Sequence, residues 1–151
     1  MKKYLIFLIF LITITGCKKI QTDFTETDRK IIQDYITSHG LTNVQSTASG
    51  MYYVIEKPGT TTHPNVYSTV TVTYTGRLAN DTIFDTTVGG SPATFALSGV
   101  IQGWQIGIPL IGRGGKCKLM IPSSLGYGGV AQYGIPKNSV LVFDISLLDY
   151  Y

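Results

Sequence analysis

Histidine, cysteine and tryptophan are scarce in this sequence, and so are charged residues. Of its 151 residues, two are histidine, two are cysteine and one is tryptophan, and charged residues make up 14%. Neither His39 nor His63 has a second ligand at a spacing typical of metal sites, and no serine lies in the sequence pattern of a hydrolase nucleophile. The net charge of +3 is too small to indicate a nucleic acid partner. The composition therefore predicts no metal site and no nucleic acid interface.

The sequence also lacks an apolar run long enough for a transmembrane helix, which needs about 20 residues. The apolar stretch from Tyr4 to Thr15 is shorter; two lysines precede it and Cys17 follows it closely. This order is typical of a secretory signal, and small residues directly before a cysteine resemble a bacterial lipobox. We therefore expect a lipoprotein signal peptide over residues 1–16, lipidation of Cys17 and a tether over 17–24. An ordinary signal peptide with an incidental cysteine is the alternative.

The residue after the expected anchor bears on localisation. Lys18 follows Cys17 in place of the aspartate that bacterial sorting rules link to inner-membrane retention, so we expect an exported, lipid-anchored cell envelope protein of the outer membrane. With Cys17 lipidated, Cys117 is the single remaining thiol and no intramolecular disulfide can form. Cys117 alternates with Lys116 and Lys118 and has no histidine near it in the sequence, which favours a buried apolar role over a nucleophile.

Residues 25–50 are predicted to form an N-terminal helix and a linker. Thr25 and Asp28 have the spacing of a capping box, and Gly40 is placed to end the helix after His39. Four apolar residues recur at helical spacing on one face: Ile31, Ile32, Tyr35 and Ile36. We interpret the segment as a helix that packs on the domain, and a docking or dimerisation element is the alternative.

The rest of the sequence, residues 51–151, is predicted to be one β-rich domain. Apolar residues alternate strictly with threonines from Val70 to Thr75, which is typical of a half-buried strand. A short helix is expected between Gln102 and Leu110, although Gly103 and Gly107 lower its intrinsic propensity. Further strands are expected at 51–55, 83–84, 92–97, 116–121 and 140–148. Together they indicate an α+β fold with an antiparallel sheet.

A glycine-rich run over residues 112–116 invites comparison with phosphate-binding loops. Such loops place Ser or Thr after the lysine and lead into a helix. Here Cys117 follows Lys116, and the run leads into a predicted strand. The run therefore predicts a tight turn before a strand.

Aromatic residues carry the clearest functional signal. Trp104 closes the run VIQGW, and other aromatics recur at the ends of the apolar segments on either side: Tyr74, Phe84, Phe95, Tyr127 and Phe143. Few acids, bases or metal ligands accompany them. This pattern indicates an apolar pocket that works by shape and by exclusion of water.

Six motifs that follow one another along the chain resemble a known family. They are VTVTYTGRL at 70–78, FD at 84–85, VIQGW at 100–104, GKCKLMIP at 115–122, LGYGG at 125–129 and IPKNSVLVFDISLL at 135–148. In this order they resemble the FKBP-type peptidyl-prolyl cis-trans isomerases, and the lipobox resembles the exported lipoprotein branch of that family. The resemblance covers about residues 66–150. It implies a twisted antiparallel sheet of about five strands wrapped around one short helix.

The resemblance also implies a proline pocket and the residues that form it. Trp104 is its floor, Asp85 and Tyr127 are its polar members, and the backbone amide of Ile101 donates to a bound carbonyl. The implied catalytic residues are Tyr127, Asp85 and Trp104, and the implied substrate-binding residues are Tyr74, Phe84, Val100, Ile101, Trp104, Tyr127, Ile135 and Phe143. Composition alone favours plain core for Trp104, Phe143 and Tyr74, and their position within the family motif reverses that preference. The alternative for Asp85 is the cap of the turn after Phe84.

The function implied by the resemblance is isomerisation of X-Pro bonds in unfolded or nascent exported polypeptides, without metal or cofactor. Macrolide immunosuppressants are the implied small-molecule ligands. A non-catalytic binding module or holdase chaperone that grips unfolded chains in the same groove is the alternative. The sequence departs from the family at Ala93, where an aromatic is common, at Gly134, and in a shorter loop between Leu97 and Val100. We expect these changes to open the pocket rim.

Overall fold

The computed structural model describes residues 24–151. The predicted signal peptide and the lipidation site Cys17 therefore lie outside the described residues. Within that part of the chain, no helix is both long enough and apolar enough to cross a membrane. The helices are α1 (Phe24–Ser38) and α2 (Gln102–Gly107), and the 3-10 turns are η1 (Leu97–Gly99), η2 (Ile108–Leu110) and η3 (Ser123–Leu125).

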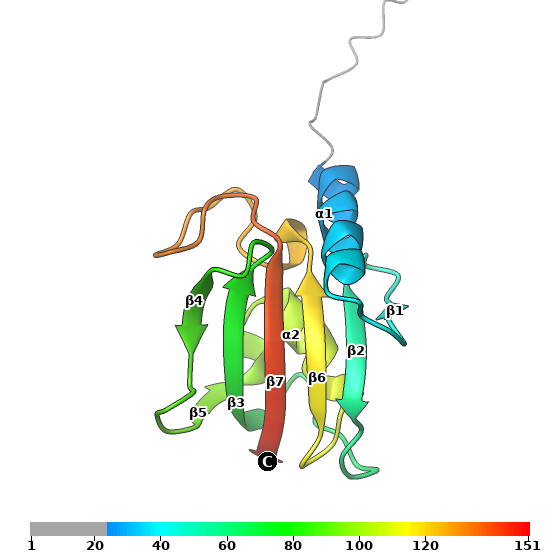
Figure 1. Ribbon diagram of the computed structural model, residues 1–151. Coiled ribbons are helices and arrows are strands. Elements are labelled where there is room, and N and C mark those ends of the chain that lie inside the picture. Colours follow the sequence, from blue (N-terminus) through cyan, green and yellow to red (C-terminus); the bar gives the residue numbers. More distant parts are fainter. Residues whose placement is uncertain (1–23) are drawn as a thin grey trace, which may run out of the picture.

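Over the described residues the strands form one antiparallel sheet in the order β1-β2-β6-β7-β3-β4, and β5 also pairs with β3 (Figure 1). β5 pairs with the first half of β3 and β4 with the second half, so both short strands lie along the same edge of β3. The strands are β1 (Gln45–Ser46), β2 (Tyr52–Lys57), β3 (Thr69–Leu78), β4 (Ile83–Thr86), β5 (Ala93–Ala96), β6 (Lys116–Ile121) and β7 (Leu141–Tyr150). The α+β fold expected from the sequence is confirmed, with two-residue β1 as an unpredicted addition.

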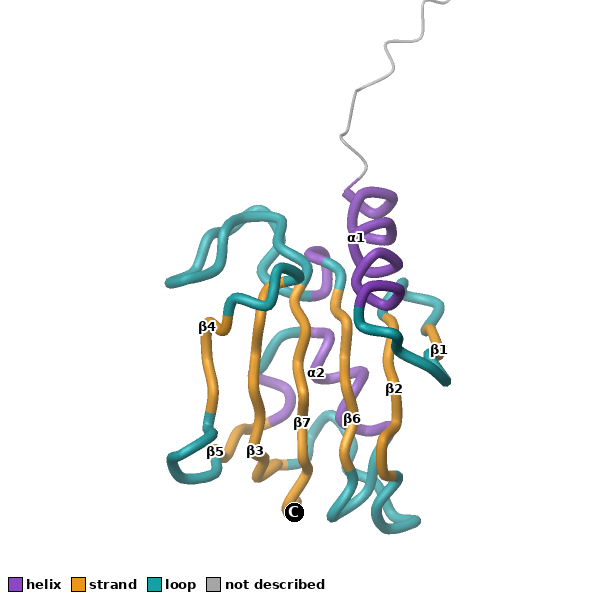
Figure 2. Tube along the Cα trace, in the orientation of Figure 1, coloured by secondary structure: helices purple, strands orange, loops and turns teal. Residues whose placement is uncertain are grey.

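The two faces of the sheet carry two separate cores, because side chains alternate between the faces along each strand. On one face Leu119 and Phe143 belong to the main core with Trp104 of α2. On the other face their neighbours Met120 and Val142 pack against α1. The two helices thus lie on opposite sides of the sheet, as Figure 2 shows.

Helix α2 lies unusually close to β6 because two of its six residues are glycine. A Cβ atom at Gly103 would lie 2.5 Å from Ile121, and one at Gly107 would lie 2.4 Å from Leu119. Carbon atoms normally stay about 3.5–4.0 Å apart. The glycines that weaken the helix on propensity therefore allow its contact with the sheet.

Helix α1 packs through the face that its sequence predicts, but its Asp28 makes a contact that the sequence does not predict. Ile32 is fully buried, and Tyr35 is nearly so. Asp28 is only 2% exposed, and its carboxylate accepts hydrogen bonds from the backbone N (2.8 Å) and the Oγ (2.7 Å) of Ser123. The expectation that Asp28 serves a capping box is therefore replaced by a tie between α1 and η3, a partner far away in the sequence.

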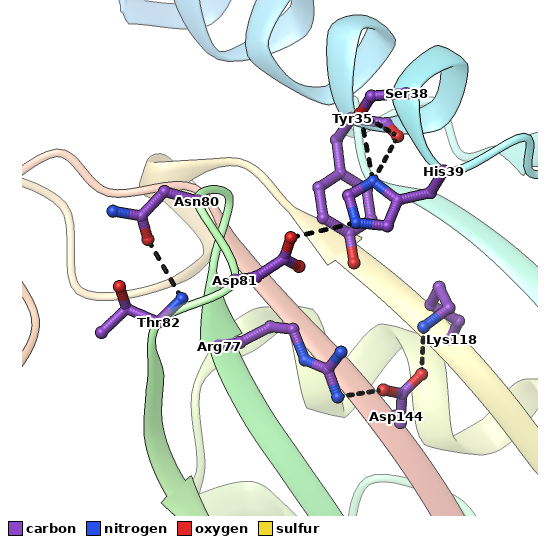
Figure 3. A network of polar contacts seen from close by, with 9 residues as sticks. All are labelled: Tyr35, Ser38, His39, Arg77, Asn80, Asp81, Thr82, Lys118 and Asp144. Atoms are coloured by element: carbon purple, nitrogen blue, oxygen red, sulfur yellow. Dashed lines mark hydrogen bonds and ion pairs between the residues drawn. The ribbon is translucent and has the colours of Figure 1, made fainter.

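The end of α1 is attached to the turn between β3 and β4 (Figure 3). The His39 ring stacks on Tyr35 with 3.8 Å between centroids, and its Nε2 lies 3.2 Å from Oδ2 of Asp81 in that turn. On the sheet below, Arg77 and Lys118 both pair with Asp144. The end of α1 is thus joined to the β3–β4 turn by a polar contact, and an ion-pair cluster joins β3, β6 and β7 on the sheet beside it.

Cys117 is 1% exposed, in the main core between β2 and β7. Burial raises the pKa of its thiol to about 12. Because only a thiolate is a strong nucleophile, the side chain is an apolar core residue. This placement confirms the sequence interpretation.

Candidate active site

A pocket of about 310 Å³ lies on the face of the sheet that carries α2. Its walls come from β3, β4, β5, η1, α2 and β7 and from the turn that carries Tyr127. The lining residues are Tyr74, Phe84, Asp85, Phe95, Gly99, Val100, Ile101, Trp104, Tyr127 and Phe143. Six of the ten are Phe, Trp or aliphatic residues, so the cavity has mainly apolar walls. Its volume is at the lower end of the range for small-molecule sites.

Trp104 lies at the centre of this aromatic group. It is 4% exposed, and its ring meets Tyr74, Phe143 and Phe95 edge-on at centroid distances of 5.0, 5.2 and 5.7 Å. Such contacts stabilise a pair by roughly 0.5–1.5 kcal/mol beyond the burial of area. The indole ring is therefore held in one orientation from three sides, as a pocket floor requires.

Gly76 in β3 makes room for two of the pocket walls. A Cβ atom at this position would lie 2.6 Å from Cε1 of Phe143 and 2.7 Å from Cε2 of Phe84. The two phenyl rings meet edge-on, with 5.6 Å between their centroids. Their arrangement therefore depends on a strand residue that has no side chain.

The charged member of the pocket is Asp85, and its partner is Tyr74. The Tyr74 hydroxyl donates a hydrogen bond of 2.5 Å to Oδ2 of Asp85. Burial, and secondly this hydrogen bond to a carboxylate, raises the pKa of Tyr74 well above its usual range. Tyr74 therefore stays protonated and keeps its role as a donor. The sequence predicted Tyr74 as an apolar wall and gave no sign of this pairing across two strands.

Hydrogen-bond donors also face the cavity. Ile101 precedes α2, and its carbonyl accepts from the amides of Trp104 (3.0 Å) and Gln105 (3.3 Å). Its own amide forms no hydrogen bond within residues 24–151. Tyr127 is 38% exposed at the rim, between two glycines of the turn after η3. This arrangement leaves one backbone donor and one phenol available to a bound carbonyl.

Seven of the eight predicted binding residues line the pocket, and Ile135 does not. Ile135 is 5% exposed and packs in the main core, where it pairs with Gln132. Phe95, which the aromatic pattern named but the resemblance did not, and Gly99 also line the pocket. Period-two alternation in β5 places Phe95 on the same face as Ala93, so the strand pattern contained that signal.

Comparison with known proteins decides the family. Residues 60–148 match the model of the FKBP-type peptidyl-prolyl cis-trans isomerases. The chain belongs to this family. FkpA of Aeromonas hydrophila, an FKBP-type peptidyl-prolyl cis-trans isomerase, is 42% identical over 132 residues, which are 86% of this chain and 49% of that protein.

Solved FKBP-type structures agree with the fold. The crystal structure of FkpA from Escherichia coli aligns with a TM-score of 0.75 and 37% identity, over 85% of this chain and 61% of that one. A peptidyl-prolyl cis-trans isomerase from Pseudomonas syringae aligns with a TM-score of 0.70 and 32% identity, over 83% of this chain and 95% of that one. The chain spans about half the length of the curated FKBP-type relatives it matches.

Proposed function

We propose that the protein is a peptidyl-prolyl cis-trans isomerase that accelerates rotation about X-Pro bonds in exported polypeptides. The observation that carries the proposal is the aromatic pocket over Trp104, in a chain that belongs to the FKBP-type family. The proline ring binds on the indole. The walls that hold it are Tyr74, Phe84, Val100, Ile101, Tyr127 and Phe143.

The reaction breaks no covalent bond, so the pocket needs no nucleophile. The barrier to rotation about the amide is about 18–20 kcal/mol, because resonance gives the C–N bond partial double-bond character. Water favours the planar amide, since it solvates the charge that resonance places on the oxygen. Aromatic walls exclude that water and so remove an advantage of the planar ground state over the twisted amide.

Two donors are suited to favour the twisted form. The Ile101 amide holds one carbonyl of the substrate, and the Tyr127 hydroxyl donates to the group that rotates. Tyr74 and Asp85 form the polar part of the wall. Catalysis comes from interactions that are stronger with the twisted amide than with the planar one, and each ~1.4 kcal/mol of that difference gives about tenfold in rate.

A protease-coupled assay on an X-Pro peptide tests the proposal. We expect the purified chain to accelerate cis-to-trans conversion, and Trp104→Ala to remove most of that acceleration because the floor is lost. Tyr127→Phe keeps the ring and removes only the hydroxyl, so we expect a smaller loss. A folded wild-type chain that leaves the uncatalysed rate unchanged contradicts the isomerase proposal.

A holdase that grips unfolded chains is the second candidate function. Val130 is 62% exposed and Tyr133 is fully exposed, on the loop that follows the pocket residue Tyr127. Exposed apolar side chains beside a binding groove are suited to contact an unfolded chain. This function predicts suppression of client aggregation, which Val130→Ser and Tyr133→Ser reduce while the isomerisation rate stays unchanged.

Macrolide immunosuppressants are the proposed small-molecule ligands of the same pocket. With Ala93 and a short loop before Val100, we expect an open rim and therefore weaker binding than in relatives that have an aromatic in place of Ala93. Trp104 is the sole tryptophan of the sequence, and its fluorescence reports binding at the floor directly. Unchanged Trp104 fluorescence at saturating macrolide contradicts binding there.

The proposed location is the cell envelope, with a lipid on Cys17 anchoring the protein in the outer membrane. The lipobox and Lys18 support this proposal. Incorporation of labelled palmitate that Cys17→Ala abolishes is the expected result. Equal labelling of both proteins contradicts the anchor.

A further inference from the structure

The pocket has a negative charge and no positive one. Of its ten lining residues, only Asp85 is charged at neutral pH. Asp85 lies on the edge strand β4 and is exposed at the mouth of the cavity. A substrate side chain next to a bound proline therefore meets a carboxylate before it meets any other charge of the pocket.

Asp85 has a free acceptor oxygen. Oδ2 accepts from the Tyr74 hydroxyl, and Oδ1 forms no hydrogen bond within the described residues. A carboxylate can accept about four hydrogen bonds. Asp85 therefore keeps most of its capacity for a donor from outside the chain.

Each of the other aspartates of residues 24–151 either lies near a basic side chain or is buried. Asp34, Asp81, Asp144 and Asp149 lie within ion-pair distance of Lys, His or Arg side chains, two of which Figure 3 shows. Asp28 is buried against Ser123. Asp85 alone among them is exposed without a cationic partner, and it is the one in the pocket.

We propose that Asp85 determines substrate preference: the pocket favours prolines flanked by Lys or Arg and disfavours prolines flanked by Asp or Glu. The proposal rests on the isomerase function proposed above. A cationic side chain donates to Oδ1 while the proline ring lies on Trp104, and a carboxylate at the same place is repelled. Lys and Arg have long stems that pack along aromatic walls and still reach the charge.

The effect is moderate because Asp85 is exposed. Exposed ion pairs change an equilibrium by roughly two- to fivefold, and repulsion acts on the opposite substrate by a similar factor. We therefore expect the ratio of kcat/KM between a Lys peptide and a Glu peptide to be about five- to twentyfold. The ratio falls with added salt, since the Debye length shrinks from about 10 Å at 0.1 M to about 3 Å at 1 M.

The test uses the full chain and two sets of X-Pro peptides, with Lys, Gln or Glu directly before or directly after the proline. We expect the wild type to prefer Lys over Glu at one flank at least. Asp85→Asn keeps an acceptor for the Tyr74 hydroxyl and removes the charge, so its ratio approaches one. Asp149→Asn removes the same charge from a site outside the pocket, and we expect it to keep the wild-type ratio.

The Gln peptides separate the two proposals. If the wild type does not accelerate them or any other peptide, the isomerase function itself fails. If it does accelerate them, but the Lys-to-Glu ratio is near one at both flanks or is unchanged in Asp85→Asn, the role of Asp85 is refuted. A wild-type ratio that does not fall with added salt also refutes it, because the preference is then not electrostatic.

Discussion

Gly76→Ala is expected to damage the pocket through a single methyl group. The added Cβ would lie 2.6 Å from Phe143 and 2.7 Å from Phe84, about 1 Å inside the normal contact distance of 3.5–4.0 Å. The backbone at Gly76 is not in the left-handed region, so alanine causes no strain of its own. Both rings have to move instead, and both are walls of the pocket.

The expected losses of stability and activity follow from the size of that displacement. Overpacking by one methyl group in a packed core costs about 1–3 kcal/mol of unfolding free energy. For a domain of this size, 1 kcal/mol lowers Tm by about 4 °C. A displacement of about 1 Å in a binding site costs up to about 10²-fold in rate. We expect a fall in kcat/KM of at least about tenfold for an X-Pro peptide.

Gly99→Ala is the matched control. Gly99 also lines the pocket, but a Cβ atom there meets nothing within 4 Å. We therefore expect Gly99→Ala to keep the wild-type Tm and to change kcat/KM less than threefold. Thermal unfolding and the protease-coupled assay measure both variants. If Gly76→Ala equals the wild type in both measurements, the packing of Phe84 and Phe143 around this glycine is refuted.

Three further predictions concern groups on either side of the sheet. Asp28→Ala leaves the two donors of Ser123 in η3 unpaired, so it should lower the free energy of unfolding by about 1–3 kcal/mol. Asp34→Ala, on the exposed face of α1, is the control and should lower it by less than about 1 kcal/mol. Urea unfolding measures both variants. Tyr74→Phe removes the donor to Asp85 while keeping the ring, so kcat/KM should fall with little change in Tm. The pKa of Cys117 is raised to about 12, so the folded state holds this proton more tightly than the unfolded state. The contribution of Cys117 to the free energy of unfolding is therefore complete below about pH 8.5 and declines as the pH rises toward 12. Cys117→Ala should lack this decline, so the difference between the two proteins in urea unfolding should change over that range.

The sequence predicts the sheet well because its strands obey a simple rule. Val70 and Val72 are buried on one face while the threonines between them lie on the other, and alternation alone places them there. Helix α2 is harder to predict, since Gly103 and Gly107 argue against a helix locally. The two glycines are needed only in the folded protein, where β6 packs directly against them.

Contacts between distant segments account for what the sequence does not show. Asp28 has the spacing of a capping residue, but its partner is Ser123, far along the chain. The hydrogen bond from Tyr74 to Asp85 depends on the pairing of β3 with β4 and on the ring orientations in the pocket. Ile135 was assigned to the pocket by resemblance; it packs in the main core next to its bridge to Gln132 and is not among the residues that line the cavity.

The most direct test of the central claim is the rate of X-Pro isomerisation with the purified chain and with Trp104→Ala and Trp104→Phe. We expect the wild type to accelerate the reaction, Trp104→Ala to lose most of the acceleration, and Trp104→Phe to keep part of it because a ring still covers the floor. All three proteins are checked for folding by circular dichroism. Equal acceleration by a folded Trp104→Ala protein, or none by the wild type, contradicts catalysis on the aromatic floor.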